Sequence, residues 1–238
     1  METTDIINGT FSLIIVIVSF YVGGYIASRY RKFNRKTLLF VGLSWIGVNN
    51  GWWPSAISFL TTLIYGKSLP DPIYFFIGNA FIPFFLLIWM VAITELMYKD
   101  QQKPILALFT IIGTIFEIFF FYYLFTSPET IGESGAVNVE YKGFVSLYLI
   151  FILLTILITG LLFVRESLKS DNEVTKLKGK FLAVAFISYT IGAIADAMIP
   201  LTLLTLPIIR ILLISSAIEF YIGWIMPERV QKYFLKRN

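Results

Sequence analysis

Long apolar segments, each about as long as a bilayer is thick, constrain the fold of this chain more than any other feature. A helix that crosses the hydrocarbon core needs about 20 mainly apolar residues. Seven segments meet this requirement, at residues 7–28, 37–65, 73–98, 105–126, 144–164, 181–203 and 207–226. Only short polar loops separate them, and none is large enough to fold alone. The sequence therefore predicts an all-α integral membrane protein with a single seven-helix domain over residues 1–238.

The composition supports lipid as the main solvent of this chain. Hydrophobic residues make up 57% of it, and the mean hydropathy is +0.78. Soluble domains contain about 45–50% apolar residues, so the excess is typical of membrane proteins. We therefore expect a multi-pass protein of the cell membrane, with the lipid bilayer as its first partner.

The basic residues predict the orientation of the helices. Of the 19 Lys and Arg residues, 16 fall in four segments on one side of the predicted bundle, at residues 29–36, 99–103, 165–180 and 227–238. Cytoplasmic loops of membrane proteins carry such an excess. We expect an outer N-terminus and a cytoplasmic C-terminus. This bias accounts for the pI of about 9.1 without nucleic-acid binding, and the basic face would meet anionic lipid or a protein partner.

Two residue types are missing from the chain, and their absence excludes whole classes of chemistry. There is no His and no Cys, so the usual ligands of zinc, copper and haem are lacking, as are Ser-His-Asp and Cys-His catalytic sets. Retinal requires a Schiff-base lysine, and residues 207–226 contain none. We expect no metal, no cofactor and no enzymatic activity.

Polar side chains inside the apolar segments are the candidates for function, because burying them in lipid costs free energy. A rise of about 1.5 Å per residue puts seven of them in the outer half of a hydrocarbon core about 30 Å thick. The predicted ligand-binding set is Asn49, Asn50, Trp52, Trp53, Asn79, Asp196 and Arg210.

Two interpretations of this set remain open. Asp196 and Arg210 lie on either side of the short turn before the last helix, so they are expected to form an ion pair. The pair and the amides then serve either as structural links between helices or as the walls of a polar pocket open to the outside. Asn49 and Asn50 project about 100° apart on a helix, so one neighbouring helix cannot easily satisfy both.

Glu117 and Glu219 also fall within apolar segments, and neither has an obvious basic partner in the sequence. A buried carboxyl without such a partner tends to be protonated. It can then act in a proton relay or as a hydrogen-bond donor in a packed bundle. Near the N-terminus, Asn8-Gly9-Thr10 forms an N-glycosylation sequon on the predicted outer side.

A weak internal periodicity relates the two ends of the chain. Pro72 precedes Trp89 by 17 residues, and Pro207 precedes Trp224 by the same distance. The pattern predicts a parallel repeat of three helices, one linker helix and three more helices.

The stretch RILLISSAIEFYIGWIMPERV, residues 210–230, ends a seventh helix in Gly, an aromatic residue and Pro. It resembles the exit segment of the seven-helix membrane input modules of prokaryotic sensor proteins, such as those of histidine kinases. The resemblance implies sensing of a ligand or of the membrane state. In that family a cytoplasmic signalling domain follows, whereas here only a short basic tail follows, so the output would pass through a partner.

Three functions agree with these features. The first is a stand-alone sensor or receptor-like module that binds a small ligand in the outer half of the bundle. The second is a secondary or proton-coupled transporter, in which Pro54 and Pro83 would break helices. The third is an accessory or structural subunit of a membrane complex.

Overall fold

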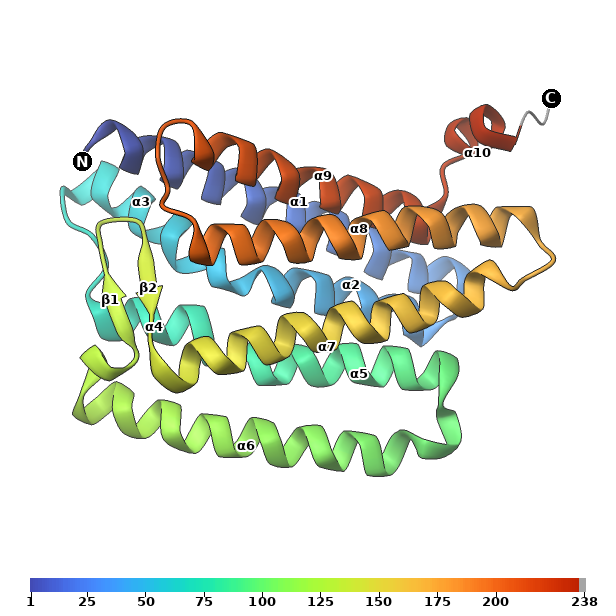
Figure 1. Ribbon diagram of the computed structural model, residues 1–238, viewed down its shortest axis with the longest axis horizontal. Helices are drawn as coiled ribbons and strands as arrows, with labels where there is room; N and C mark the ends of the chain where they lie inside the picture. The colour runs from blue at the N-terminus through green and yellow to red at the C-terminus, as the bar shows by residue number, and fades with distance from the viewer. Residues whose placement is uncertain (236–238) are drawn as a thin grey trace.

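The computed structural model describes residues 1–235 and consists of long helices with one small hairpin (Figure 1). In chain order the elements are α1 (Thr3–Phe33), α2 (Lys36–Val48), η1 (Asn49–Trp52), α3 (Trp53–Tyr65), α4 (Asp71–Asn79), α5 (Ile82–Met97), η2 (Lys99–Gln101), α6 (Gln102–Thr126), η3 (Pro128–Thr130), β1 (Gly132–Ser134), β2 (Val139–Tyr141), α7 (Gly143–Leu168), α8 (Glu173–Met198), α9 (Thr205–Ile225) and α10 (Glu228–Leu235).

Six helical segments of the described chain are long and apolar enough to cross a membrane. They are Thr3–Phe33, Asp71–Met97, Lys99–Thr126, Gly143–Leu168, Glu173–Met198 and Thr205–Ile225. Large apolar side chains cover their outward faces, which is what a lipid environment requires of a helical bundle. The prediction of an all-α fold with helices long and apolar enough to cross a membrane is therefore confirmed.

The remaining apolar segment, predicted at 37–65 as one helix, is interrupted rather than merely kinked. The α-helix ends at Val48, a 3₁₀ turn covers Asn49–Trp52, and a new helix begins at Trp53. Pro54 lies in the first turn of α3, where its missing N–H leaves no internal bond unmade. Proline in a continuous helix would instead lack a hydrogen bond and clash with the preceding turn.

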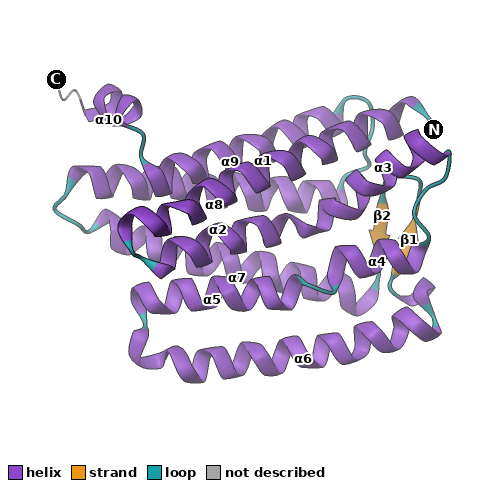
Figure 2. Cartoon of the chain, turned by 180° about the vertical axis from the view of Figure 1, so that it is seen from behind, coloured by secondary structure: helices purple, strands orange, loops and turns teal. Residues whose placement is uncertain are grey.

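A second interruption follows in the segment predicted at 73–98. The helix α4 ends at Asn79 and α5 begins at Ile82, with Pro83 again in the first turn. The helix α4 packs on η1, so the two interruptions lie side by side in the bundle (Figure 2). Irregular backbone at membrane depth is tolerated where protein or a cavity surrounds it.

The helices pack as a ring with one helix outside it. Around the ring α1 packs on α2, α2 on α5, α5 on α7, α7 on α8, α8 on α9 and α9 on α1. The helix α6 packs on the outer side of α5 and α4 (Figure 1). Gly23 lets α1 approach α2 closely, because a Cβ there would lie 2.5 Å from the carbonyl oxygen of Gly42.

The two ends of the bundle differ in character. The N-terminus and the β1–β2 hairpin lie at one end, and the tight turns after α1, α5 and α7 lie with α10 at the other (Figure 1). The hairpin, antiparallel with Glu133 opposite Glu140, was not predicted from the sequence. Its three-residue strands lie in the loop expected at 127–143 and are too short to give a clear alternating pattern.

Most helix boundaries differ from the predicted ones by a few residues; α1, for example, spans Thr3–Phe33 rather than 7–28, and α8 ends at Met198 rather than at residue 203. The helix α8 begins at Glu173 rather than at residue 181, because Asn172 caps it by accepting hydrogen bonds from the amides of Val174 and Thr175. The helix α9 begins at Thr205, so Pro207 lies in its first turn instead of closing the preceding loop. Hydropathy locates the apolar part of a helix but not its polar ends.

Candidate functional site

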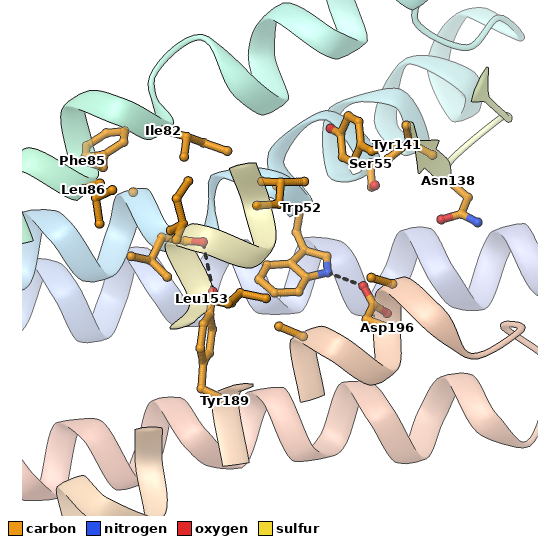
Figure 3. A pocket seen from close by; sticks show the side chains of 18 of the residues that line it. Trp52, Ser55, Ile82, Phe85, Leu86, Asn138, Tyr141, Leu153, Tyr189 and Asp196 are labelled. Carbon is orange, nitrogen blue, oxygen red and sulfur yellow. Dashed lines mark hydrogen bonds between the residues drawn. The ribbon is translucent and has the colours of Figure 1, made fainter. Parts of the chain in front are cut away.

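Trp52, Asp196 and Arg210 form the centre of the candidate site. The indole Nε1 of Trp52 donates to Oδ2 of Asp196 at 3.0 Å (Figure 3). Nη2 of Arg210 lies 3.1 Å from the other carboxylate oxygen, and the guanidinium lies 5.8 Å from the centre of the Trp52 ring. The ion pair expected from the sequence is thus present, and an aromatic face covers it.

One of these three residues lies in the 3₁₀ turn between α2 and α3, and the other two lie at the facing ends of the α-helices α8 and α9. Trp52 is the last residue of the 3₁₀ turn, so the interruption of the helix turns its side chain toward α8. Asp196 lies in the last turn of α8 and Arg210 in the second turn of α9. The short turn between these helices brings both charges to one level of the bundle.

Asn8 completes the charged centre, although the sequence indicated only a sequon there. Its side-chain oxygen accepts from Nη2 of Arg210 at 2.7 Å, and its nitrogen donates to the carbonyl of Val137 at 3.1 Å. The side chain is buried, with 4% of its surface exposed, so both ends of the amide are used inside the protein. Asn8 therefore links the ion pair to the hairpin.

A cavity of about 160 Å³ lies against this centre. Its polar lining includes Trp52, Ser55, Asn138, Tyr141, Tyr189, Asp196 and Arg210. Aliphatic and aromatic side chains form the rest, among them Ile82, Phe85, Leu86, Ile152, Leu153 and Ala193. Asn138 is also exposed at the surface, so the cavity approaches the outside of the protein at the hairpin.

Two tyrosines line the cavity, and of their hydroxyls only that of Tyr189 has a hydrogen-bond partner among the described residues. Tyr189 donates to the carbonyl of Val48 at 3.0 Å, which satisfies a backbone group freed where α2 ends. The hydroxyl of Tyr141, on the hairpin, packs over Gly78, where a Cβ would approach it to 2.6 Å. Burial of this hydroxyl raises the pKa of Tyr141, so it stays neutral and can act as a hydrogen-bond donor.

Four of the seven predicted ligand-binding residues lie outside the cavity lining. Asn49 donates to the carbonyl of Trp45, Asn50 to that of Ile77, and Asn79 to that of Phe75. These amides satisfy backbone carbonyls next to the two interruptions. Trp53 turns away from the cavity centre and packs its ring against Phe20 and Phe85.

The two remaining carboxyl candidates also lie apart from the cavity. Glu219 accepts a hydrogen bond from Ser188 at 2.6 Å, between α8 and α9. Glu117 lies on α6 and is half-buried, and its Oε2 has no hydrogen-bond partner among the described residues. The two carboxyls and Asp196 therefore do not form one continuous chain of contacts.

Comparison with known proteins identifies no relative: no protein-family model, no curated protein and no solved structure matches the chain. Within residues 1–235, no group of three or more His, Cys, Asp and Glu side chains is placed to hold a metal ion. The interpretation of the site therefore depends on its own contacts.

Sequence reasoning missed the contributions of Asn8, Tyr189 and the hairpin. The sequence carries a signal for the first, because Asn8 is a polar residue in the first turns of an apolar helix. The sequon offered a competing explanation for it. Nothing local to residues 131–141 indicates that they reach a buried ion pair.

Proposed function

We propose that this chain is a seven-helix sensor or receptor-like module of the cell membrane that binds a small ligand in the outer half of its bundle. One observation carries the proposal. A cavity of about 160 Å³ adjoins a buried ion pair and an indole at the level where two helices are interrupted. Binding sites in helical membrane proteins favour such interruptions, because they leave polar groups facing a cavity.

The proposed topology counts α2, η1 and α3 together as a seventh crossing, in addition to the six continuous ones. The basic turns and α10 would face the cytoplasm, and the N-terminus and hairpin would face outside. The position of α6 outside the ring agrees with a linker between two triplets, α1 to α5 and α7 to α9. This supports the proposed parallel repeat.

The proposed output runs through a partner at the basic cytoplasmic face. The helix α9 ends at Ile225, and Met226 adopts a left-handed conformation (φ 50°) before Pro227. The helix α10, with Arg229 and Lys232, follows as a short separate helix (Figure 1) and contacts α8 where the rings of Phe234 and Phe181 lie 5.4 Å apart. A ligand that shifts α9 at Arg210 would thereby move a segment available to a protein partner.

The experiment for this proposal uses two glycines. A side chain at either Gly51 or Gly24 would meet no atom within 4 Å at its Cβ, but only Gly51 lines the cavity, whereas Gly24 faces outward from α1. Small molecules are screened for stabilisation of the protein in lipid nanodiscs. We expect the ligands found to lose their effect in Gly51→Leu and to keep it in Gly24→Leu. Ligands that stabilise both variants equally would overturn the proposal.

Transport is the second candidate, and the paired interruptions favour it specifically. Discontinuous helices side by side are typical of secondary transporters, in which they surround the substrate. In proteoliposomes a transporter would exchange labelled for unlabelled ligand across the membrane. A sensor would bind the same ligand without counterflow.

A further inference from the structure

The donors of Arg210 are only partly used. Nη2 donates a hydrogen bond to Asn8 and lies 3.1 Å from Oδ1 of Asp196 as an ion pair. Nε and Nη1 of Arg210, and Oδ1 of Asp196, have no hydrogen-bond partner among the described residues. The Arg210 side chain is 2% exposed and lines the cavity. Arginine carries five N–H donors and no acceptor, so these two nitrogens can donate to an acceptor on a molecule in the cavity. Leaving them unmet in a buried site costs free energy.

The charge of the site limits what that acceptor can be. Asp196 and Arg210 are the only Asp, Glu, Lys or Arg residues in the cavity lining, and their charges cancel. A ligand with a full negative charge would leave one uncompensated charge in a region of low dielectric. A neutral acceptor meets the free N–H groups without that penalty.

The remaining walls favour an apolar body of limited size. Phe85 and Leu86 lie toward one end of the cavity, and Asn138, Tyr141 and Asp196 lie toward the other (Figure 3). The volume of about 160 Å³ is similar to that of an engineered cavity, about 150 Å³, that binds benzene. The cavity thus accommodates a ring-sized apolar group with one polar end.

We propose that the ligand is a neutral, mainly apolar molecule of about this size with a carbonyl-type oxygen at one end. The oxygen accepts a hydrogen bond from the free nitrogens of Arg210, and the apolar body lies against Phe85 and Leu86. This inference rests on the proposed function, since it names the class of ligand for the same cavity.

Three probes of similar shape separate the alternatives. Acetophenone is neutral and has a carbonyl, ethylbenzene lacks the acceptor, and benzoate adds a negative charge. Their affinities are measured on the full chain in nanodiscs. The binding signal measured with the Gly51→Leu variant is subtracted from that of the unmodified chain. This subtraction removes the contribution of probe molecules that partition into the lipid. Because a hydrogen bond to a charged donor is worth about tenfold in affinity or more, we expect acetophenone to bind at least about tenfold more tightly than either analogue.

A variant that keeps the site neutral provides the control. Asp196→Asn combined with Arg210→Met removes both charges and the guanidinium donors. The preference for acetophenone over ethylbenzene should then fall to about twofold or less. In the unmodified chain, the infrared carbonyl band of bound acetophenone should shift to lower frequency, and this shift should be lost in the double variant.

Other outcomes would overturn the inference in distinguishable ways. Equal binding of ethylbenzene and acetophenone would mean that the cavity selects only for apolar bodies. Tighter binding of benzoate would mean an anion site. Either result would contradict the proposed class of ligand, but it would still agree with the proposal that a small molecule binds in the cavity. If Gly51→Leu changes the binding of none of the three probes, the proposed function fails as well.

Discussion

Arg210 is the one charged side chain among the described residues that is almost completely buried, and Asp196 supplies its balancing charge. A buried pair of this kind contributes little net stability compared with apolar residues of the same shape, because both charges lose their hydration. Removing one partner is different, because it leaves the other charge uncompensated. The pair is therefore more informative about function than about stability.

Asp196→Ala should destabilise the protein by about 3–5 kcal/mol, the usual cost of leaving a buried charge without its partner. The double variant Asp196→Asn/Arg210→Met should lose less, because no charge remains. Unfolding by heat or denaturant in a mild detergent measures both. A double variant less stable than Asp196→Ala would contradict this account.

The ion pair was predictable from the sequence and its third partner was not. Asp196 and Arg210 flank a short turn, so their proximity follows from helix lengths alone. Asn8 lies 202 residues from Arg210, and no local pattern encodes that contact. The hydrogen-bond partners of Asn49, Asn50 and Asn79 were also not predictable from a local pattern. Their side chains bind backbone carbonyls that lie next to the two helix interruptions.

Asn8→Ala should lower stability by about 2–4 kcal/mol, because it removes one hydrogen bond to a charged group and one to a backbone carbonyl. Thr10→Ala destroys the same sequon but leaves the buried amide in place. Thr10 is exposed, and its hydroxyl bonds only within its own helix, to Ile6. The free energy of unfolding of Thr10→Ala should therefore be nearly the same as that of the unmodified chain in the same assay. Equal losses in the two variants would exclude a structural role for Asn8.

Among the elements, the hairpin contributes three residues to the cavity lining, one of which is exposed at the surface. Asn138, Val139 and Tyr141 line the cavity, and buried Ile131 and Val137 anchor the hairpin. Hydropathy predicted the positions of the apolar spans because each is a long, continuous signal. It could not predict the hairpin, whose position depends on two buried side chains and on single hydrogen bonds to α1, α3 and α4.

Ser58 of α3 is one of those anchors. Its hydroxyl donates to the carbonyl of Ala136 at 2.6 Å and accepts from the amide of Leu69 at 3.1 Å. In Ser58→Ala both bonds are lost, so the amide of Leu69 and the hairpin amides should exchange with solvent about tenfold faster. Hydrogen exchange followed by mass spectrometry measures this. Thr61→Ala is the control, because its hydroxyl bonds only within the same helix.

The hairpin also carries a pH-dependent contact outside the membrane-spanning segments. Lys142 donates to Glu133, and this hydrogen bond lowers the pKa of the Glu133 carboxyl. A lowered pKa means that the contact is present above the ordinary pKa of glutamate and is lost as the pH falls through the folded value. An NMR titration of Glu133 should show this, and Lys142→Gln should return the pKa of Glu133 toward the ordinary range.

For the whole molecule, the absence of cysteine makes the proposed orientation directly testable. Glu140 on β2 and Asp171 in the turn between α7 and α8 are both exposed, and these two segments lie at opposite ends of the bundle (Figure 1). With a membrane-impermeant thiol reagent, Glu140→Cys should react in intact cells. Asp171→Cys should react only after the membrane is opened. The reverse pattern would mean that the basic end faces outward.

The contact between Asn8 and Arg210 also has a consequence for biogenesis. Helices of membrane proteins enter the bilayer in chain order, so α1 is inserted long before α9 is made. Until Arg210 has been made, the side-chain oxygen of Asn8 lacks that donor. Formation of this contact therefore requires that the chain has been made through Arg210, so the two ends of the bundle's sequence are joined late in synthesis.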